Sequence, residues 1–156
     1  PDFALALLRE AKKRHIHTTI ETCGHYPTDV LDQACRVLDA LIFDIKCLDS
    51  ARHKKATGVG SELILKNIGH VFEHFPDLPV LIRTPVIPGF NDTEEDILGI
   101  REMIPRKANI RYEALTYHRM GQPKYGYLGR RYELEGVKAD EAFMKRLNIM
   151  LKTYEQ

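Results

Sequence analysis

The chain has 156 residues, the length of one domain or of part of a larger one. With 44% hydrophobic and 29% charged residues it has a globular composition, which excludes a disordered or fibrous chain. Its 23 basic and 22 acidic residues give a net charge of +1, and no apolar run reaches the ~18–20 residues of a membrane span, so nothing calls for nucleic acid or a membrane as partner.

The first half of the chain alternates between helical and strand patterns. Apolar residues at helical spacing predict a helix over 3–14, and the β-branched alternation of HIHTTIET predicts a strand over 15–22. A second helix begins at Thr28, or at the proline before it, and its apolar stripe extends to Leu38. The apolar run ALIFDI, over 40–45, is typical of a strand buried on both faces of a parallel sheet.

The second half continues the same alternation. Asp49 and Ser50 can cap a short helix, which Gly58 and Gly60 break. Ser61, Thr93 and Asp140 are each placed to cap a further helix. In chain order we expect helices over 51–56 and 61–75, a strand over 78–87, a helix over 93–104, a strand over 109–116, a Gly-, Tyr-, Arg- and Lys-rich loop over 118–138, and a helix over 140–154.

This order, a helix followed by four strand–helix units, predicts an α/β fold with a parallel sheet and right-handed crossovers. Four strands are too few to close a barrel. The sheet is therefore either open or lacks strands on its N-terminal side. The first helix begins without a cap, which favours the second alternative.

Charged and polar residues stand where each predicted strand ends. Glu21 ends the first strand, Asp44 and Lys46 the second, Arg83 the third, and His118 follows the fourth. Ligands of parallel α/β proteins bind at the carboxyl ends of the strands, so we expect one shared site there. Each residue alone has a simpler explanation, such as a structural Asp44–Lys46 ion pair, but four polar strand ends are hard to explain by packing.

Other candidate features have simpler explanations. Cys23, Cys35 and Cys47 form no CxxC or CxxxCxxC motif, so we expect three reduced thiols in a cytoplasmic protein. The pair His15–x–His17 has the spacing of half a metal site, but it would lie at the opposite end of its strand and is expected at the surface.

The remaining motifs are also assigned to structure. The sequence Gly58–Val59–Gly60–Ser61 could cradle a phosphate before a helix, but it lacks the rest of a P-loop, and a turn followed by a cap explains it. Three further histidines fall on predicted helices and are expected at the surface: His53, His70 and His74.

The chain contains, in order, the segments IHTTIETCG, LIFDIK, GVGSELILKN, VLIRTPVIPGFNDTEEDI and YHRMGQPKYGYLG. Together they resemble the glycyl-radical-enzyme activating enzymes of the pyruvate formate-lyase activating type, in the radical S-adenosylmethionine superfamily. No single motif is unique to that family. The combination of D-x-K, R-x-P-V-I-P-G-x-N-D and Y-H-x-x-G at these intervals is specific.

The resemblance implies an incomplete (β/α) barrel of six strands. A CxxxCxxC loop after the first strand would hold a [4Fe–4S] cluster, and the second strand would end in Gly-Gly-Glu. Neither motif occurs here, so residues 1–156 are expected to form strands three to six, the C-terminal part of the barrel, without cluster cysteines.

The resemblance also implies an activity for the full-length enzyme in an anaerobic cytoplasm. It would cleave S-adenosylmethionine reductively, with flavodoxin or ferredoxin as electron donor. The resulting 5′-deoxyadenosyl radical would remove a hydrogen from a backbone glycine of a partner such as pyruvate formate-lyase. The cluster and the cofactor carry that chemistry, and the protein supplies position and charge.

Site residues follow from the same resemblance. Asp44, Ile45 and Lys46 match the D-x-K segment that contacts S-adenosylmethionine, Arg83 matches an arginine beside its methionyl end, and His118 matches a histidine near its adenosyl part. No catalytic residue and no metal ligand are expected in this part of the enzyme.

Glu21 and Thr22 match an acidic-Thr pair that in some members helps to hold a monovalent cation next to the cofactor. The acid is Glu here, where the best-known member type has Asp. Together the two carboxylates and the two cations, Lys46 and Arg83, suit a ligand that is both a zwitterion and a sulfonium.

Three functions are therefore weighed. The first is the S-adenosylmethionine-binding part of an activating enzyme, in which the loop over 119–132 helps to dock the partner's glycine loop. The second is an aldolase-like barrel that forms a Schiff base at Lys46, although the adjacent Asp44 would keep the amine protonated. The third is a module without enzymatic activity that docks a partner protein.

Overall fold

The structure, a computed structural model, describes residues 1–154 and contains one sheet of four parallel strands in the order β1-β2-β3-β4. The strands are β1 (Thr19–Thr22), β2 (Ala40–Asp44), β3 (Val80–Val86) and β4 (Ile110–Thr116). The predicted α/β class and the parallel sheet are confirmed.

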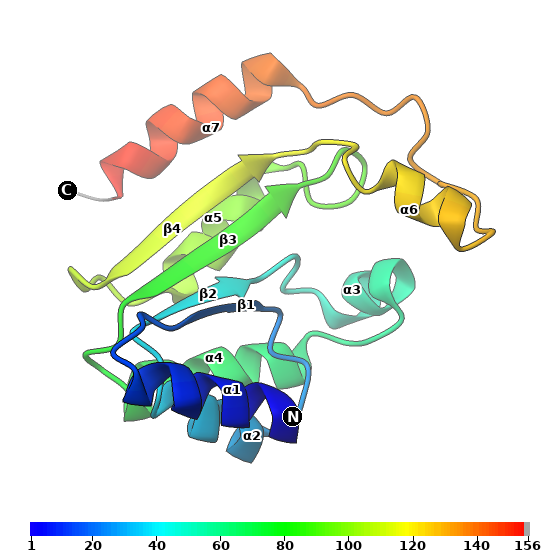
Figure 1. Ribbon diagram of the computed structural model, residues 1–156. Coiled ribbons are helices and arrows are strands. Elements are labelled where there is room, and N and C mark those ends of the chain that lie inside the picture. Colours follow the sequence, from blue (N-terminus) through cyan, green and yellow to red (C-terminus); the bar gives the residue numbers. More distant parts are fainter. Residues whose placement is uncertain (155–156) are drawn as a thin grey trace.

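Seven helices surround this sheet in the described residues: α1 (Asp2–Lys13), α2 (Thr28–Cys35), α3 (Ser50–Thr57), α4 (Glu62–His74), α5 (Glu94–Met103), α6 (Gln122–Tyr127) and α7 (Glu141–Thr153). Helix α5 lies behind β3 and β4, while α1, α2 and α4 lie below β1, and α7 lies above β4 (Figure 1). Helices α3 and α6 lie beyond the carboxyl ends of the strands. Within residues 1–154 no helix combines the length and the apolar character needed to cross a membrane.

Side chains alternate between two faces of the sheet. The face turned toward the helices, called here the covered face, carries buried residues such as Phe43 of β2, Ile82 of β3 and Tyr112 of β4. The opposite face, called here the open face, carries partly exposed residues in the intervening positions, and burial alternates strictly along β2 and β3. Because successive side chains of a strand point to opposite sides, a shift by one residue would exchange these two sets.

Helix starts follow the predicted capping residues in three of four cases. The side chains of Asp49, Thr93 and Asp140 each accept a hydrogen bond from the backbone N–H three residues on, at the start of α3, α5 and α7. Ser61 occupies the corresponding position before α4, but its hydroxyl donates instead to the Leu48 carbonyl, 2.9 Å away. It therefore fixes the loop that joins α3 to α4.

The first predicted strand was placed too early, because β1 begins at Thr19 and not at His15. Side chains take the place of the sheet hydrogen bonds just before it. The Thr18 N–H donates to Asp39 Oδ2 at 2.8 Å, and the Thr18 hydroxyl donates to the Val37 carbonyl at 2.7 Å. His15 adopts a positive φ of 56°, which turns the chain between α1 and the strand.

Three further predictions were wrong. Helix α2 ends at Cys35, although Leu38 still packs in the core. The loop predicted over 118–138 contains the short helix α6. His53, expected at the surface, is 3% exposed, because the 58–61 turn folds back over its ring and the Val59 carbonyl lies 2.7 Å from its Nδ1.

Candidate functional site

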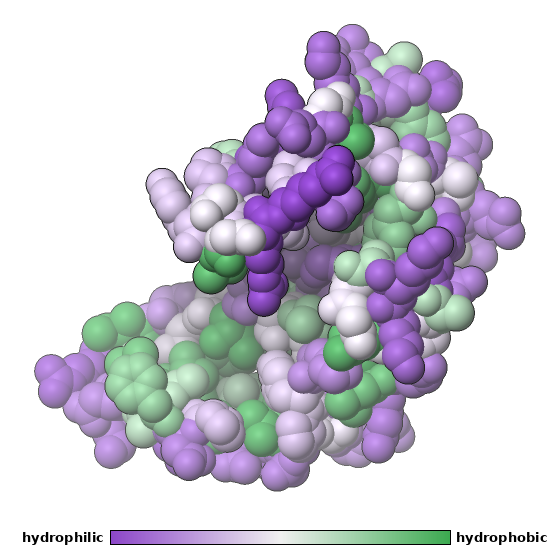
Figure 2. Space-filling model, turned by 90° about the vertical axis from the view of Figure 1, so that its right-hand side faces the viewer, coloured by the Kyte–Doolittle hydropathy of each residue, from purple (hydrophilic) through white to green (hydrophobic). Residues whose placement is uncertain are grey.

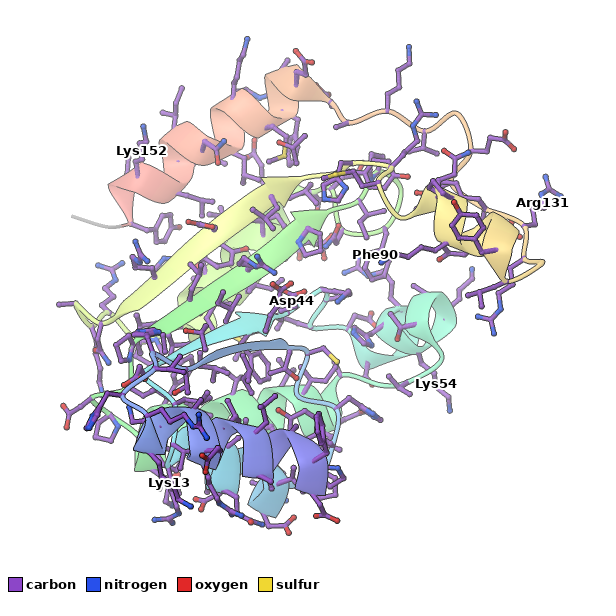
Figure 3. All side chains as sticks on the ribbon, viewed as in Figure 1. Lys13, Asp44, Lys54, Phe90, Arg131 and Lys152 are labelled. Atoms are coloured by element: carbon purple, nitrogen blue, oxygen red, sulfur yellow. The ribbon has the colours of Figure 1, made fainter. Side chains whose placement is uncertain are left out.

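A cluster of opposite charges occupies the open face where the first three strands end. The Arg83 guanidinium of β3 forms an ion pair with Glu21 of β1, and its Nε lies 3.4 Å from Asp44 Oδ1 of β2. Lys46, just beyond β2, places its Nζ 3.9 Å from Asp44 Oδ2. Asp44 stands at the carboxyl end of β2, on the side that faces β3 (Figure 3). These four residues are called here the rim cluster.

The strand register explains why these residues meet. Asp44 and Arg83 are direct partners across β2 and β3, and Glu21 is the partner of Ile42, two positions before Asp44 on the same face. Neighbouring strands are about 4.8 Å apart, so side chains of this length reach one another across three strands. The predicted convergence of Glu21, Asp44, Lys46 and Arg83 is thus confirmed as geometry.

The cluster is half-buried rather than sealed. The Arg83 and Asp44 side chains are 20% and 21% exposed, while that of Glu21 is 55% exposed. Burial by itself lowers the pKa of the Arg83 guanidinium, but Asp44 and Glu21 outweigh it and hold that pKa above its usual value. The guanidinium is therefore charged, and water-exposed atoms of the cluster are free to exchange partners with a ligand.

A buried asparagine joins the loops that follow β2 and β3. Asn91 is fully buried, and its Nδ2 donates to the carbonyls of Lys46, at 2.7 Å, and Pro85, at 3.0 Å. Its Oδ1 accepts from the Ile87 N–H at 2.7 Å. Asn91 therefore fixes the backbone on which Lys46 stands relative to the strand that carries Arg83.

Thr84 makes a second link between the same strands. It is fully buried on the covered face, and its hydroxyl donates to the Ile45 carbonyl at 2.7 Å. This bond satisfies a carbonyl at the end of β2, where the ladder stops. It also holds the end of β2 against β3, directly behind the rim cluster.

The loop after β1 is held by a third buried polar residue, Asn67 of α4. Its Nδ2 donates to the carbonyls of Gly24, at 2.6 Å, and Tyr26, at 2.8 Å. Gly24 has a positive φ of 68°, and a Cβ there would lie 2.3 Å from Cζ of Phe43. Only glycine permits this close turn, which holds the end of β1 against β2.

Three of the predicted site residues lie apart from the rim cluster. The side chains of Thr22 and Ile45 point to the covered face, where the Thr22 hydroxyl accepts from the Gly24 N–H at 3.0 Å and Ile45 is 1% exposed. His118 follows β4 and is exposed, with no hydrogen bond or ion pair to the cluster within residues 1–154. A ligand that spans the strand ends could still contact His118, so its role stays a prediction.

Sequence reasoning missed the three buried polar residues that support the site. Asn67 interrupts the apolar stripe of α4, between Ile64 and Val71, and a polar residue in such a stripe was a detectable signal. Asn91 lies within the segment VLIRTPVIPGFNDTEEDI but was given no role of its own. Thr84 directly follows Arg83 in the third strand but was given no role of its own.

The donor set does not suit a metal or an iron–sulfur cluster. Among residues 1–154 no group of three or more His, Cys, Asp or Glu side chains could hold a metal ion. Cys35 and Cys47 are buried and Cys23 is exposed, and all three are free thiols. The arrangement instead offers two carboxylates and two cations to a small molecule that carries both signs of charge.

Known proteins resemble the whole chain, although no family model matches it. It is 98% identical over 156 residues to the (2S)-3-sulfopropanediol sulfolyase activating enzyme of Bilophila wadsworthia (strain 3_1_6), covering all of this chain and 52% of that protein. It is 46% identical over 151 residues to the isethionate sulfite-lyase activating enzyme of Nitratidesulfovibrio vulgaris (strain Hildenborough), covering 97% of this chain and 49% of the relative. The chain thus spans about half the length of these relatives.

A solved structure shares the fold. A domain of the pyruvate-formate lyase-activating enzyme from Bacteroides vulgatus ATCC 8482 superposes with a TM-score of 0.74 and 25% sequence identity, covering 99% of this chain and 86% of that one. The four parallel strands are therefore part of a radical S-adenosylmethionine barrel, as the resemblance implied.

Proposed function

Because its relatives are the activating enzymes of glycyl-radical enzymes and its sheet is part of their barrel, we propose that this chain is the S-adenosylmethionine-binding half of such an enzyme. The observation that carries the proposal is the rim cluster, in which Arg83 lies between the carboxylates of Glu21 and Asp44.

The residues present fit S-adenosylmethionine but not the [4Fe–4S] cluster. The cofactor combines a carboxylate, an ammonium and a sulfonium, and the rim cluster supplies partners of both signs in one half-buried place. A [4Fe–4S] cluster requires several cysteine thiolates, and two of the three cysteines are buried away from the open face. Ligands for the cluster are expected in the other half of the longer protein.

Each residue of the rim cluster then has a distinct task. Arg83 and Lys46 bind the cofactor carboxylate, with Arg83 able to donate two parallel hydrogen bonds. Asp44 accepts from the ammonium, and Glu21 offsets positive charge from the edge strand. When bound, S-adenosylmethionine supplies the chemistry that removes hydrogen from a glycine of the partner. Asn91 and Thr84 keep the strand ends aligned while the charged side chains change partners.

The proposed partner is a lyase that breaks a carbon–sulfur bond, of the kind named for the relatives, rather than the pyruvate formate-lyase offered as the example from the sequence. (2S)-3-Sulfopropanediol sulfolyase is the specific candidate, because the relative named for it shares 98% of the aligned residues. An electron donor of the flavodoxin or ferredoxin type belongs to this proposal as an expectation.

The Schiff-base alternative loses its support. Lys46 lies within ion-pair distance of Asp44 and shares the open face with Arg83, which is the environment of a binding lysine. The relatives from Bilophila wadsworthia and Nitratidesulfovibrio vulgaris are named as activating enzymes and not as aldolases. Borohydride trapping with a carbonyl substrate is therefore expected to give no adduct at Lys46.

The proposal is tested with the longer protein that contains this chain. After anaerobic reconstitution with iron and sulfide, it is incubated with S-adenosylmethionine, a reductant and purified (2S)-3-sulfopropanediol sulfolyase. Electron paramagnetic resonance is expected to detect a glycyl radical on the lyase. A reconstituted protein that cleaves S-adenosylmethionine but leaves the lyase without a radical would contradict the assignment of the partner.

A further inference from the structure

Residues 119–132, called here the arm, differ in charge from the rest of the chain. The arm contains four basic residues, Arg119, Lys124, Arg130 and Arg131, and no acidic residue. The other residues comprise 19 basic and 22 acidic side chains, so they carry a net negative charge. The 14 residues of the arm thus carry a net positive charge, in contrast to the rest of the chain.

The arm also exposes apolar side chains. Four of the nine large hydrophobic residues that are exposed in the described chain belong to it: Met120, Tyr125, Tyr127 and Leu128. Tyr127 is 87% exposed, and α6 buries none of its residues. Tyr, Met and Arg are the residue types enriched where proteins meet, so exposed side chains of these types within one short segment favour an interaction surface.

The arm is ordered by its own contacts. The hydroxyls of Tyr117 and Tyr132 are hydrogen-bonded at its base, and the rings of Tyr125 and Tyr132 meet edge to face with centroids 5.0 Å apart. The Arg130 N–H donates to the Tyr125 carbonyl at 2.8 Å. A surface that is ordered in advance loses less conformational entropy on binding.

The arm lies beside the route to the rim cluster. It extends from the carboxyl end of β4, on the side of the sheet where the strands end, with Arg131 at its outer edge (Figure 3). Seen from this side, the molecule is hollowed between its upper and lower parts (Figure 2). A protein segment that approaches Asp44 from that side therefore passes close to the arm.

We propose that the arm is a docking surface for an acidic patch on the glycyl-radical enzyme that this protein activates. The inference rests on the proposed function. It names the surface with which the activating enzyme recognises its protein substrate. Basic residues steer the acidic partner to the arm, and Tyr127 and Leu128 supply the apolar contact at its centre.

The test measures binding of purified (2S)-3-sulfopropanediol sulfolyase to the longer protein by biolayer interferometry at low and at physiological salt. The first variant reverses three charges of the arm, Lys124→Glu, Arg130→Glu and Arg131→Glu. The second is Tyr127→Ala, which removes one exposed ring and leaves the fold untouched. The control reverses three exposed charges of α7 instead, Lys145→Glu, Arg146→Glu and Lys152→Glu, so that the change in net charge is the same.

We expect the arm charge reversal to weaken sulfolyase binding at least tenfold and to remove most of its salt dependence, and Tyr127→Ala to weaken it by roughly five- to tenfold. The control is expected to stay within about twofold of wild type. Equal weakening by the arm and control variants, or unchanged binding by both arm variants, would overturn the proposal. Sedimentation that shows Tyr127→Ala dissociating a dimer, with sulfolyase binding unchanged, would assign the arm to a second copy of the chain instead.

S-adenosylmethionine affinity separates this proposal from the proposed function. Titration calorimetry of the cofactor is expected to give the wild-type value in both arm variants, because the arm lies outside the rim cluster. Absence of cofactor binding in every protein, with arm-dependent sulfolyase binding retained, would count against the cofactor role alone.

Discussion

The two faces of the same sheet have different tasks, although their residues alternate along the same strands. On the covered face, Phe43, Ile82 and Tyr112 pack against helices and are nearly inaccessible to solvent. On the open face, Asp44 directly follows Phe43 in β2 and Arg83 directly follows Ile82 in β3, and both side chains stay partly exposed. The comparison shows how one chain segment can form a rigid core and a charged binding surface at once.

The difference between the faces also explains why the charged side chains stand in defined places. Fully buried charges would require a complete set of partners, and fully exposed ones would move freely in water. The open face lies between these limits. Its charges are oriented by strands whose positions are fixed from behind, through Asn91, Thr84 and the packed core.

The largest expected effect compares neighbouring residues of β3 on opposite faces. Ile82→Ala removes a fully buried side chain from the core and is expected to lower the free energy of unfolding by about 2–5 kcal/mol. Leu81→Ala, on the open face, is expected to cost about 1 kcal/mol or less, because the lost side chain is only partly buried. Urea denaturation of the longer protein measures both, and equal losses would contradict the division into two faces.

A smaller effect is expected from Asn91, which links the loops that follow β2 and β3 behind the rim cluster. Asn91→Ala leaves the carbonyls of Lys46 and Pro85 and the Ile87 N–H without their partner, at about 1–3 kcal/mol for each polar group that water does not reach. Water can enter the space that the side chain leaves and satisfy most of these groups, so we expect the total loss in the same urea measurement to be that of about one group, about 2 kcal/mol. Asn148→Ala, at an exposed position of α7, is the matched control. An equal loss of stability in that variant would contradict the structural role of Asn91.

The last effect concerns pH and arises at Cys35 of α2, in the core between that helix and the sheet. Burial raises the pKa of the Cys35 thiol from 9.0 to about 12, so the folded state favours the protonated thiol. Its contribution to stability is complete below pH 9 and is lost as the pH rises from about 9 toward 12. Urea denaturation is expected to show this alkaline loss reduced in Cys35→Ala and unchanged in the exposed Cys23→Ala.

An alkaline loss of the same size in both cysteine variants would show that Cys35 does not cause it. Part of the alkaline loss of stability is expected to remain in Cys35→Ala, because Tyr112 also contributes to it. Burial raises the pKa of the Tyr112 hydroxyl from 10.0 to about 12. That contribution is lost in turn as the pH rises through this range.

The sequence predicted the sheet and the rim cluster because both depend on alternation along short apolar strands. Asp44 and Lys46, two residues apart, had to share a face, and the ends of parallel strands had to meet. The start of β1 could not be predicted, because it depends on residues some 20 positions away in sequence. The Thr18 N–H and hydroxyl donate hydrogen bonds to Asp39 and Val37.

Strand alternation places the Thr22 side chain on the covered face, opposite to Glu21, although the family resemblance grouped the two residues. Other features depended on contacts that no local pattern displays. His53 was predicted to be exposed because it lies on a short basic helix. In the structure, the turn over 58–61 packs against its ring and buries it. The arm was predicted as a loop, because Pro123 and Gly126 have low helix propensity. Contacts between tyrosines of the arm stabilise the short helix nevertheless.

The central claim is that the rim cluster binds S-adenosylmethionine, and calorimetric titration of the cofactor into the longer protein tests it most directly. Arg83→Ala is expected to weaken binding by roughly 10–150-fold, the value of a lost charged hydrogen bond. Arg106→Ala is the control, because that exposed arginine stacks over Tyr154 at the opposite end of β4, and it should bind like wild type. Wild-type affinity in the Arg83→Ala protein would contradict the account.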